Sequence, residues 1–135
     1  MNTDTPRGQL AAQIKADNPD WQVEPFPRVP ANVTKGRPVV SVWRSDTRPG
    51  VNTLGTTHVL TIQLYAAQGM TEAGENELDD YLDALMLSIE RKGGYTNTVS
   101  QRATFANESL SGLIITTECQ SSNVWRETIL KERSI

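Results

Sequence analysis

The chain has 135 residues, of which 37% are hydrophobic and 21% are charged, which suits one compact domain with an ordinary core and excludes two full domains. The 13 Lys and Arg residues and 16 Asp and Glu residues give a net charge of −3 at pH 7, which excludes a global cationic field for binding DNA or an anionic membrane. One cysteine and one histidine exclude an internal disulfide framework, a multi-cysteine metal site and paired-histidine ligation, so we expect no metal, no cofactor and no enzyme activity.

Neither a membrane span nor a secretion signal is expected from the sequence. The most apolar stretch, residues 59–67, has about half of the ~20 residues that a membrane-spanning helix needs, and it contains the polar Thr61 and Gln63. Residues 1–10 are polar and carry no signal-like apolar segment. The sequence therefore predicts a soluble, cytoplasmic protein without a membrane partner.

The N-terminal part of the chain predicts a helix and a short strand. Thr5 and Pro6 resemble a helix N-cap followed by proline at the first helical position. Apolar residues then recur at helical spacing, which predicts a helix over residues 6–17. The proline-rich stretch that follows leaves room for only a short edge strand over residues 21–24.

Alternating apolar and polar side chains predict two long strands, over residues 37–44 and 57–66. The connection between them, residues 45–55, is longer than a usual hairpin turn of ~2–5 residues, so we expect a projecting loop that reaches a partner. A loose, solvated loop is the alternative interpretation. Within this loop we expect an ionic contact, a bend and apolar anchors, formed by Arg48, by Pro49 and Gly50, and by Val51 and Leu54 respectively.

From Thr71 onward the apolar period changes from two to 3.6, which predicts an amphipathic helix. Acidic residues from Glu72 onward suit its N-terminal end, and the basic Arg91 and Lys92 suit its C-terminal end. The glycine pair at 93–94 then predicts a left-handed cap that closes the helix.

The C-terminal part predicts two further strands. They cover residues 95–105 and 113–119, with a turn over residues 107–112 between them. A last apolar and polar run over residues 123–130 ends in a charged tail, residues 131–133. The whole chain, residues 1–135, is therefore predicted to be one α+β domain: a mostly antiparallel sheet, two helices packed on one face, and a long loop between the second and third strands.

Few residues suggest chemistry. The acidic trio Asp79, Asp80 and Asp83 could in principle hold a hard cation, but a solvated helix face is favoured. His58 could act as a general base, but it has no catalytic partner within sequence reach, which favours a structural histidine. Cys119 lies in an alternating strand, which favours a small buried hydrophobe over a reactive thiolate.

The three tryptophans, Trp21, Trp43 and Trp125, lie outside the predicted helices. On its strand, Trp43 points to the face opposite Val40 and Val42. If the helices cover the valine face, Trp43 is either rim packing or an anchor for a partner.

Four cationic residues, Lys35, Arg37, Arg44 and Arg48, gather around the second predicted strand and its loop. This is the only cationic concentration that we expect opposite the acidic trio. These residues are either solvent-exposed charges without a binding role or a surface that binds the acidic face of an identical neighbour. The second interpretation predicts head-to-tail association into a closed ring.

The layout resembles the tail terminator proteins of long-tailed, non-contractile bacteriophages, which are also called minor tail or tail-completion proteins. The resemblance covers nearly the whole chain and rests on the pattern of elements. Its features are the short first helix, the proline-rich Glu24-Pro25-Phe26-Pro27, the strand at 38–43, the loop, the strand at 58–65, the helix with Glu77-Leu78-Asp79-Asp80-Tyr81-Leu82-Asp83, and the closing strand pair.

This resemblance implies a non-enzymatic ring, usually of six subunits, that caps the tail tube and provides the surface to which the filled head attaches. The implied partners are other copies of the chain, the tail-tube protein and a head-completion or connector protein. Double-stranded DNA would pass through the lumen without sequence-specific contact. The implied location is the head–tail junction of the virion, after assembly in the host cytoplasm. The alternatives are another connector or tail-tube subunit, or a small non-enzymatic binding module.

Overall fold

The computed structural model describes residues 3–50, 55–67, 71–105, 110–122 and 124–133. The elements in chain order are α1 (Pro6–Asp17), β1 (Gln22–Glu24), β2 (Val39–Pro49), β3 (Gly55–Ala66), α2 (Glu72–Lys92), β4 (Tyr95–Phe105), β5 (Leu110–Ser122) and α3 (Val124–Arg133). The predicted α+β class is confirmed.

The five strands form one sheet in the order β1-β2-β3-β5-β4. β1 pairs with β2 in parallel, and all other neighbouring strands are antiparallel. The last strand therefore returns to the interior of the sheet, between β3 and β4, and β4 forms an edge. This order follows from composition, because β5 carries apolar residues that need burial whereas the threonine-rich β4 tolerates an edge position.

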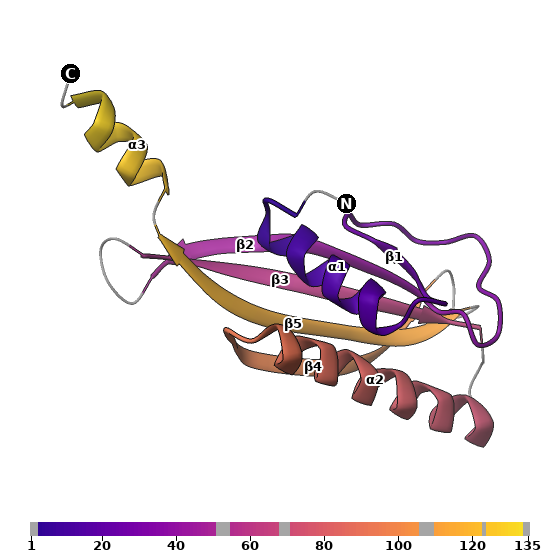
Figure 1. Cartoon of the computed structure of the whole chain (residues 1–135). Coiled ribbons are helices and arrows are strands. Elements are labelled where there is room, and N and C mark those ends of the chain that lie inside the picture. Colours follow the sequence, from indigo (N-terminus) through magenta and orange to yellow (C-terminus); the bar gives the residue numbers. More distant parts are fainter. Residues whose placement is uncertain (1–2, 51–54, 68–70, 106–109, 123, 134–135) are drawn as a thin grey trace.

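Helices α1 and α2 lie side by side on the same face of the sheet (Figure 1). Their apolar stripes meet alternate residues of the three central strands in one buried cluster. The fully buried side chains at its centre are Leu10 and Ile14 of α1, Leu85 of α2, and Val40, Val42, Leu60, Ile62, Leu64 and Ile115 of the strands. The valine face is therefore the helix face, as the alternation in β2 requires.

The predicted helix boundaries are confirmed, and local hydrogen bonds explain them. The Thr5 side chain accepts a hydrogen bond from the backbone of Gly8 at 3.2 Å, and Thr71 accepts one from Gly74 at 3.0 Å. At the end of α2, Gly93 has a φ of 74°, and its N–H donates to the carbonyl oxygen of Ile89. These caps depend on neighbouring residues alone.

Asp17 ties the end of α1 to α2. Its carboxylate accepts hydrogen bonds from Ser88 Oγ at 2.8 Å and from Gln13 Nε2 at 3.0 Å, and Arg91 Nη1 lies 3.4 Å away. The hydrogen bonds from Ser88 and Gln13, together with the charge of Arg91, lower the pKa of Asp17. These contacts fix the position of α1 relative to α2 over the sheet.

Gly112 is the tightest position on the opposite face of the sheet. A Cβ atom at this position would lie 1.8 Å from the carbonyl oxygen of Leu64. The rings of Tyr65 and Phe105 pack edge to face beside it, with centroids 4.6 Å apart. The turn predicted over residues 107–112 is wrong over residues 110–112, which belong to β5, and residues 107–109 lie outside the described residues. Gly112 is a strand residue that makes room for aromatic packing.

The predicted long loop over residues 45–55 is wrong. β2 continues to Pro49 and β3 begins at Gly55, so most of the segment is paired strand, and Val51 and Leu54 lie outside the described residues. The sequence pattern does not indicate this pairing, because the side chains of the segment are mostly polar. Backbone hydrogen bonds to β3 form without alternating apolar side chains. A β-bulge at Ser45 shifts the register between Arg44, opposite Leu60, and Asp46, opposite Val59.

These extensions form a three-stranded arm, which we define as residues 45–49 of β2, 55–59 of β3 and 118–122 of β5. The arm continues past the ends of α1 and α2 (Figure 1). Backbone hydrogen bonding holds its tip, where the N–H of Gly50 donates to the carbonyl oxygen of Gly55 at 3.0 Å. Five residues at ~3.3 Å each give an arm about 16 Å long.

The third helix was not predicted. α3 follows β5 directly and lies beyond the end of the arm (Figure 1). Trp125 is therefore in a helix, contrary to the expectation that all three tryptophans lie outside helices. The side chains of Ile129 and Leu130 are 45% and 53% exposed, and the side chains described for α3, those of residues 128–133, are all exposed.

We predict that Gly112→Ala destabilises the protein by about 2–3 kcal/mol, because the new methyl group must displace the β3 backbone or the Phe105 ring. Urea unfolding of the purified chain measures this loss. Thr104→Ala, at an exposed site of β4, is the control and should change stability by less than about 0.5 kcal/mol. Equal effects of the two substitutions would contradict the proposed crowding at Gly112.

Candidate functional site

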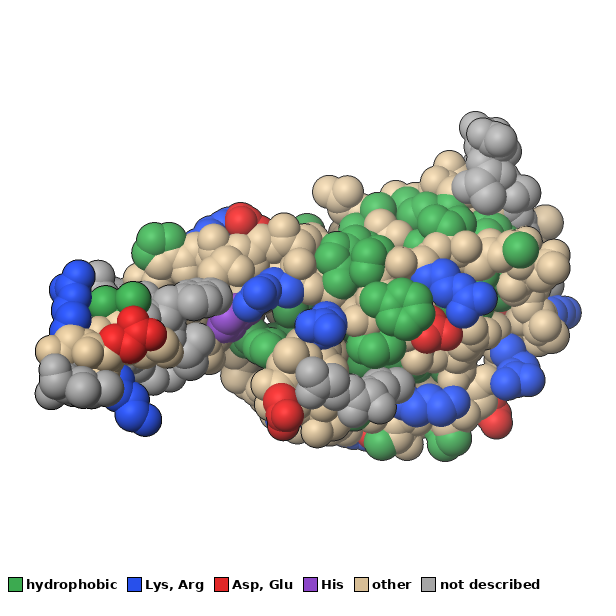
Figure 2. Space-filling view, turned by 90° about the horizontal axis from the view of Figure 1, so that it is seen from above, with side chains coloured by type: hydrophobic (Ala, Val, Ile, Leu, Met, Phe, Trp, Pro, Cys, Tyr) green, Lys and Arg blue, Asp and Glu red, His purple; other side chains and the backbone are tan. Residues whose placement is uncertain are grey.

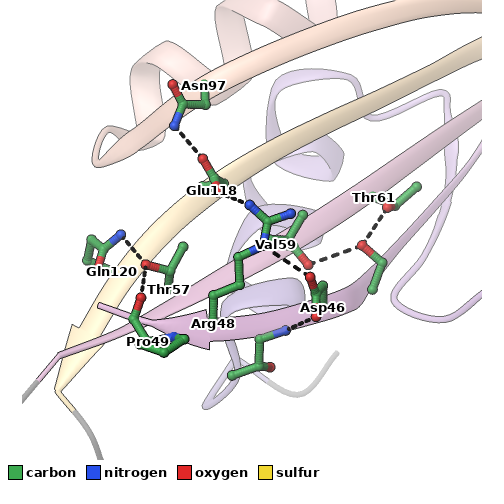
Figure 3. A network of polar contacts seen from close by, with 11 residues as sticks. Asp46, Arg48, Pro49, Thr57, Val59, Thr61, Asn97, Glu118 and Gln120 are labelled. Carbon is green, nitrogen blue, oxygen red and sulfur yellow. Dashed lines mark hydrogen bonds and ion pairs between the residues drawn. The ribbon is translucent and has the colours of Figure 1, made fainter. Parts of the chain in front are cut away.

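One face of the arm carries a polar network centred on Glu118 of β5 (Figure 3). Arg48 Nη1 lies 3.2 Å from one oxygen of Glu118, and Asn97 of β4 donates to the other. Arg48 Nε also donates to Asp46 at 3.1 Å, and the Thr47 N–H donates to the same carboxylate at 2.8 Å. These contacts connect β2, β5 and β4 across the sheet. They also mean that the Arg48 guanidinium already has partners within its own chain.

Two further groups of polar contacts, each with a hydroxyl group at its centre, lie along the arm (Figure 3). Gln120 donates to Thr57 Oγ1 at 2.6 Å, and Thr57 donates to the carbonyl oxygen of Pro49 at 3.4 Å. At the bulge, the Thr61 hydroxyl donates to Ser45 Oγ at 2.7 Å, which itself donates to the Val59 carbonyl. Among the described residues, every buried side-chain polar atom has a partner. Polar contacts thus hold the arm together, and it does not depend on an apolar core.

The bulge at Ser45 separates two of the predicted cationic residues. Arg44 pairs with Leu60 and lies on the helix face, whereas Arg48 pairs with Thr57 and lies on the opposite face. Without the extra residue, both arginines would share one face because they are four positions apart. The two arginines therefore do not form one cationic surface.

The helix face of the arm root contains a pocket of about 470 Å³. It opens where the N-terminus of α1 and the C-terminus of α2 stop above the sheet, and the surface is hollowed there beside the single histidine (Figure 2). Within it, His58 is 5% exposed, its Nε2 lies 2.7 Å from Ser121 Oγ, and its Nδ1 lies 3.4 Å from Arg44 Nη1.

These contacts fix the form of the imidazole. A guanidinium can only donate, so Nδ1 of His58 accepts from Arg44 and the proton lies on Nε2, which donates to Ser121. Burial and the charge of Arg44 lower the pKa of His58 from its ordinary value of 6.5. His58 is therefore a neutral, buried histidine near pH 7, which agrees with the structural role favoured from the sequence.

The cations Lys35 and Arg37 lie beside the acidic helix and not opposite it. Gly36, between them, donates its N–H to Glu77 Oε1 of α2 at 3.3 Å. Arg37 Nε donates to the Asp20 carbonyl oxygen at 3.1 Å. The predicted cluster is therefore divided among three places: Lys35 and Arg37 next to α2, Arg44 in the pocket, and Arg48 on the far face of the arm.

The acidic trio is exposed on α2, as predicted. Within the described part of the chain, Asp79, Asp80 and Asp83 form no ion pair, and no group of three His, Cys, Asp or Glu side chains is arranged to hold a metal ion. The trio lies near the middle of α2, and the C-terminal end of this helix is the end nearest the arm (Figure 1). Its unpaired charge is available to another molecule.

Three other predicted contact residues are placed by β2. Trp43 follows Val42 and so lies on the face opposite the helices, where it is half-buried. Pro49 ends the strand opposite Thr56, and it is exposed. Gly50 must be glycine, because a Cβ atom there would lie 2.5 Å from the backbone of Gly55.

The sequence interpretation missed the polar network as a unit. One signal was available, because Thr116, Glu118 and Gln120 alternate in the strand and so share one face. Asn97, however, adopts a positive φ of 53° at a register shift between β4 and β5, and its hydrogen bond to Glu118 depends on that shift. No local pattern identifies such a partner.

Comparison with known proteins does not assign the chain. No protein-family model matches it, and no curated protein matches it significantly. Across the described residues, none of the helices is long and apolar enough to cross a membrane.

We predict that Arg48 and Glu118 are energetically coupled by about 0.5–1 kcal/mol, because Arg48 is 57% exposed but Glu118 is only 14% exposed. A double-mutant cycle with Arg48→Gln and Glu118→Gln, read by urea unfolding, measures the coupling. The more exposed pair of Arg102 and Glu75 is the control and should show a smaller coupling. Equal couplings would mean that the network adds nothing to a surface ion pair.

We also predict that His58 makes the protein less stable in weak acid. Because its pKa is lowered in the folded state, its contribution is complete above the unfolded-state pKa near 6.5 and is lost as the pH falls toward the folded-state value. The unfolding free energy of the wild type should therefore fall more steeply between pH 7 and pH 5 than that of His58→Gln. Parallel pH profiles for the two proteins would refute this role.

Proposed function

We propose that this chain is a non-enzymatic structural subunit that forms a ring, in the manner of a phage tail terminator. The observation that carries the proposal is the pair of protruding elements, the arm and α3, which extend beyond the helix-covered body (Figure 1). Both elements lie outside the helix-covered body, where neighbouring subunits can contact them. The exposed Ile129 and Leu130 of α3 suit such a contact.

The charge distribution supports head-to-tail assembly. The acidic trio lies on the exposed face near the middle of α2, whereas Lys92 and Arg44 lie at the arm root. Among the described residues, neither cation belongs to an ion pair. One subunit therefore carries two surfaces of opposite charge, which favours a heterologous contact that closes into a ring over a two-fold dimer.

The same features suit a lumen that passes DNA without holding it. The net charge is −3, and an amphipathic helix with an acidic outer face cannot read base edges or neutralise many phosphates. In this proposal the ring caps the tail tube, meets a head-completion or connector protein on its other side, and is located at the head–tail junction of the virion.

Two alternatives have specific support. Another connector or a tail-tube subunit would use the same protruding elements, and the position of the protein in the particle distinguishes these assignments. A small binding module is favoured by one observation, the pocket of about 470 Å³ at the arm root.

The proposal predicts that phage lacking the gene produce tails of irregular length that carry no heads, because nothing stops the tube or joins it. A plasmid copy should restore normal particles, and antibody labelling in electron micrographs should mark the head–tail junction. The triple variant Asp79→Asn, Asp80→Asn and Asp83→Asn should fail to restore them although its thermal midpoint is nearly unchanged.

Glu90→Gln, on the same helix, is the control and should restore normal particles. Full-length, head-bearing tails without the gene would refute the proposed function. Labelling along the whole tube would instead assign the chain as a tube subunit. A two-fold dimer in the particle would refute head-to-tail assembly.

A further inference from the structure

The pocket at the arm root combines an apolar interior with charge at its edge. Tyr95 and Cys119 of neighbouring strands contribute half-buried side chains, and Pro6 of α1 contributes an apolar ring. Arg44 comes from β2, and Lys92 comes from the last position of α2. A volume of about 470 Å³ lies within the usual range for small-molecule sites, ~300–1,000 Å³.

Both cations are available to a ligand. Arg44 is exposed, and the hydrogen bond to His58, at the long distance of 3.4 Å, uses only one of its five N–H groups. Lys92 is exposed as well. In the described part of the chain, neither of the two forms an ion pair. Asp4 is the acidic residue that lines the pocket, so the charged side chains sum to about +1.

The remaining polar groups are neutral. Burial raises the pKa of the Cys119 thiol and raises that of Tyr95 to about 12, and burial together with the charge of Arg44 lowers that of His58. The pocket thus presents a cationic rim to solvent and uncharged walls within. A ligand that complements it has one anionic group and an apolar body of a few carbon atoms.

We propose that this pocket binds a small aliphatic carboxylate, with the carboxylate on the guanidinium of Arg44 and the ammonium of Lys92 and the hydrocarbon against Tyr95 and Cys119. A planar guanidinium matches a carboxylate by two parallel hydrogen bonds, which explains the choice of a carboxylate over other anions. Every residue that contributes to the pocket belongs to one chain, so the free subunit is the form in which binding is tested, although the proposed ring contact uses Arg44 and Lys92 as well.

Binding also has consequences for His58. A carboxylate that takes the Arg44 guanidinium neutralises the charge beside Nδ1 and withdraws its donor, so the imidazole becomes easier to protonate. The charged and titratable groups that face His58 from the surrounding elements are Arg44, Lys92, Asp4, Tyr95 and Cys119. Ligand binding should therefore raise the pH at which the His58 ring titrates.

The experiment titrates the full chain with 4-methylpentanoate and follows the His58 ring signals by NMR. Saturable shifts are expected, together with a higher titration midpoint for His58 in the bound state. The neutral 4-methylpentanamide should bind at least tenfold more weakly, because it lacks the charge that pairs with Arg44. Acetate should also bind more weakly, because it lacks the hydrocarbon body.

Arg44→Gln should weaken the binding of 4-methylpentanoate by about 10–100-fold. Arg48→Gln is the matched control, since it removes the same charge from the same strand on the opposite face of the sheet, and it should leave binding unchanged. Thermal unfolding of both variants checks that they are folded. Equal affinity for the amide, equal losses in the two variants, or no saturable shift would overturn the proposal.

Discussion

The extra residue in β2 is the constraint on which the arm depends. Ser45 opposes no residue of β3, so every later side chain of β2 changes faces. Before the bulge, β2 packs valines under the helices and places Arg44 beside His58. After it, Asp46 and Arg48 reach Glu118 on the far face. The Ser45 hydroxyl donates to the Val59 carbonyl and accepts from Thr61, which holds the bulge in place. One strand can thus serve an apolar body and a polar arm.

The ends of the two helices set the boundary between body and arm. The Thr5 cap begins α1 and Gly93 ends α2 at the same level of the sheet, so the strands beyond this level have no helix above them. An apolar face there would be exposed, and the sequence instead places threonines, His58 and charged residues in the arm. The pocket is a direct consequence, because it occupies the step between the covered and the uncovered sheet.

Self-satisfied polar contacts let the arm protrude. Its buried Thr56, Thr57 and His58 lie between paired strands, and the network around Glu118 joins β2, β5 and β4 without an apolar core. Such an arm keeps its shape in a free subunit and so presents a preorganised surface to a neighbour, which lowers the entropy lost on association. Internal use of Arg48 also limits its role in any contact, since a partner must compete with Asp46 and Glu118. Arg44 forms no ion pair among the described residues, so a partner competes only with its long hydrogen bond to His58.

Local patterns in the sequence are enough to identify the helix ends and the buried segments of β2 and β3. Thr5, Thr71 and Gly93 set the helix boundaries through bonds to residues three or four positions away, and alternation identified the buried parts of β2 and β3. The arm, the strand order and the position of Gly112 depend on contacts between residues that are far apart in the chain. The arm exists because a polar segment pairs with β3, β5 entered the middle of the sheet because its apolar residues needed burial, and Gly112 became a strand residue because two rings pack beside it. The four predicted cations were separated by the bulge and by the contact of Gly36 with Glu77, which joins residues 41 positions apart. Such long-range contacts leave no periodic signal in the chain, because they depend on which faces meet after folding.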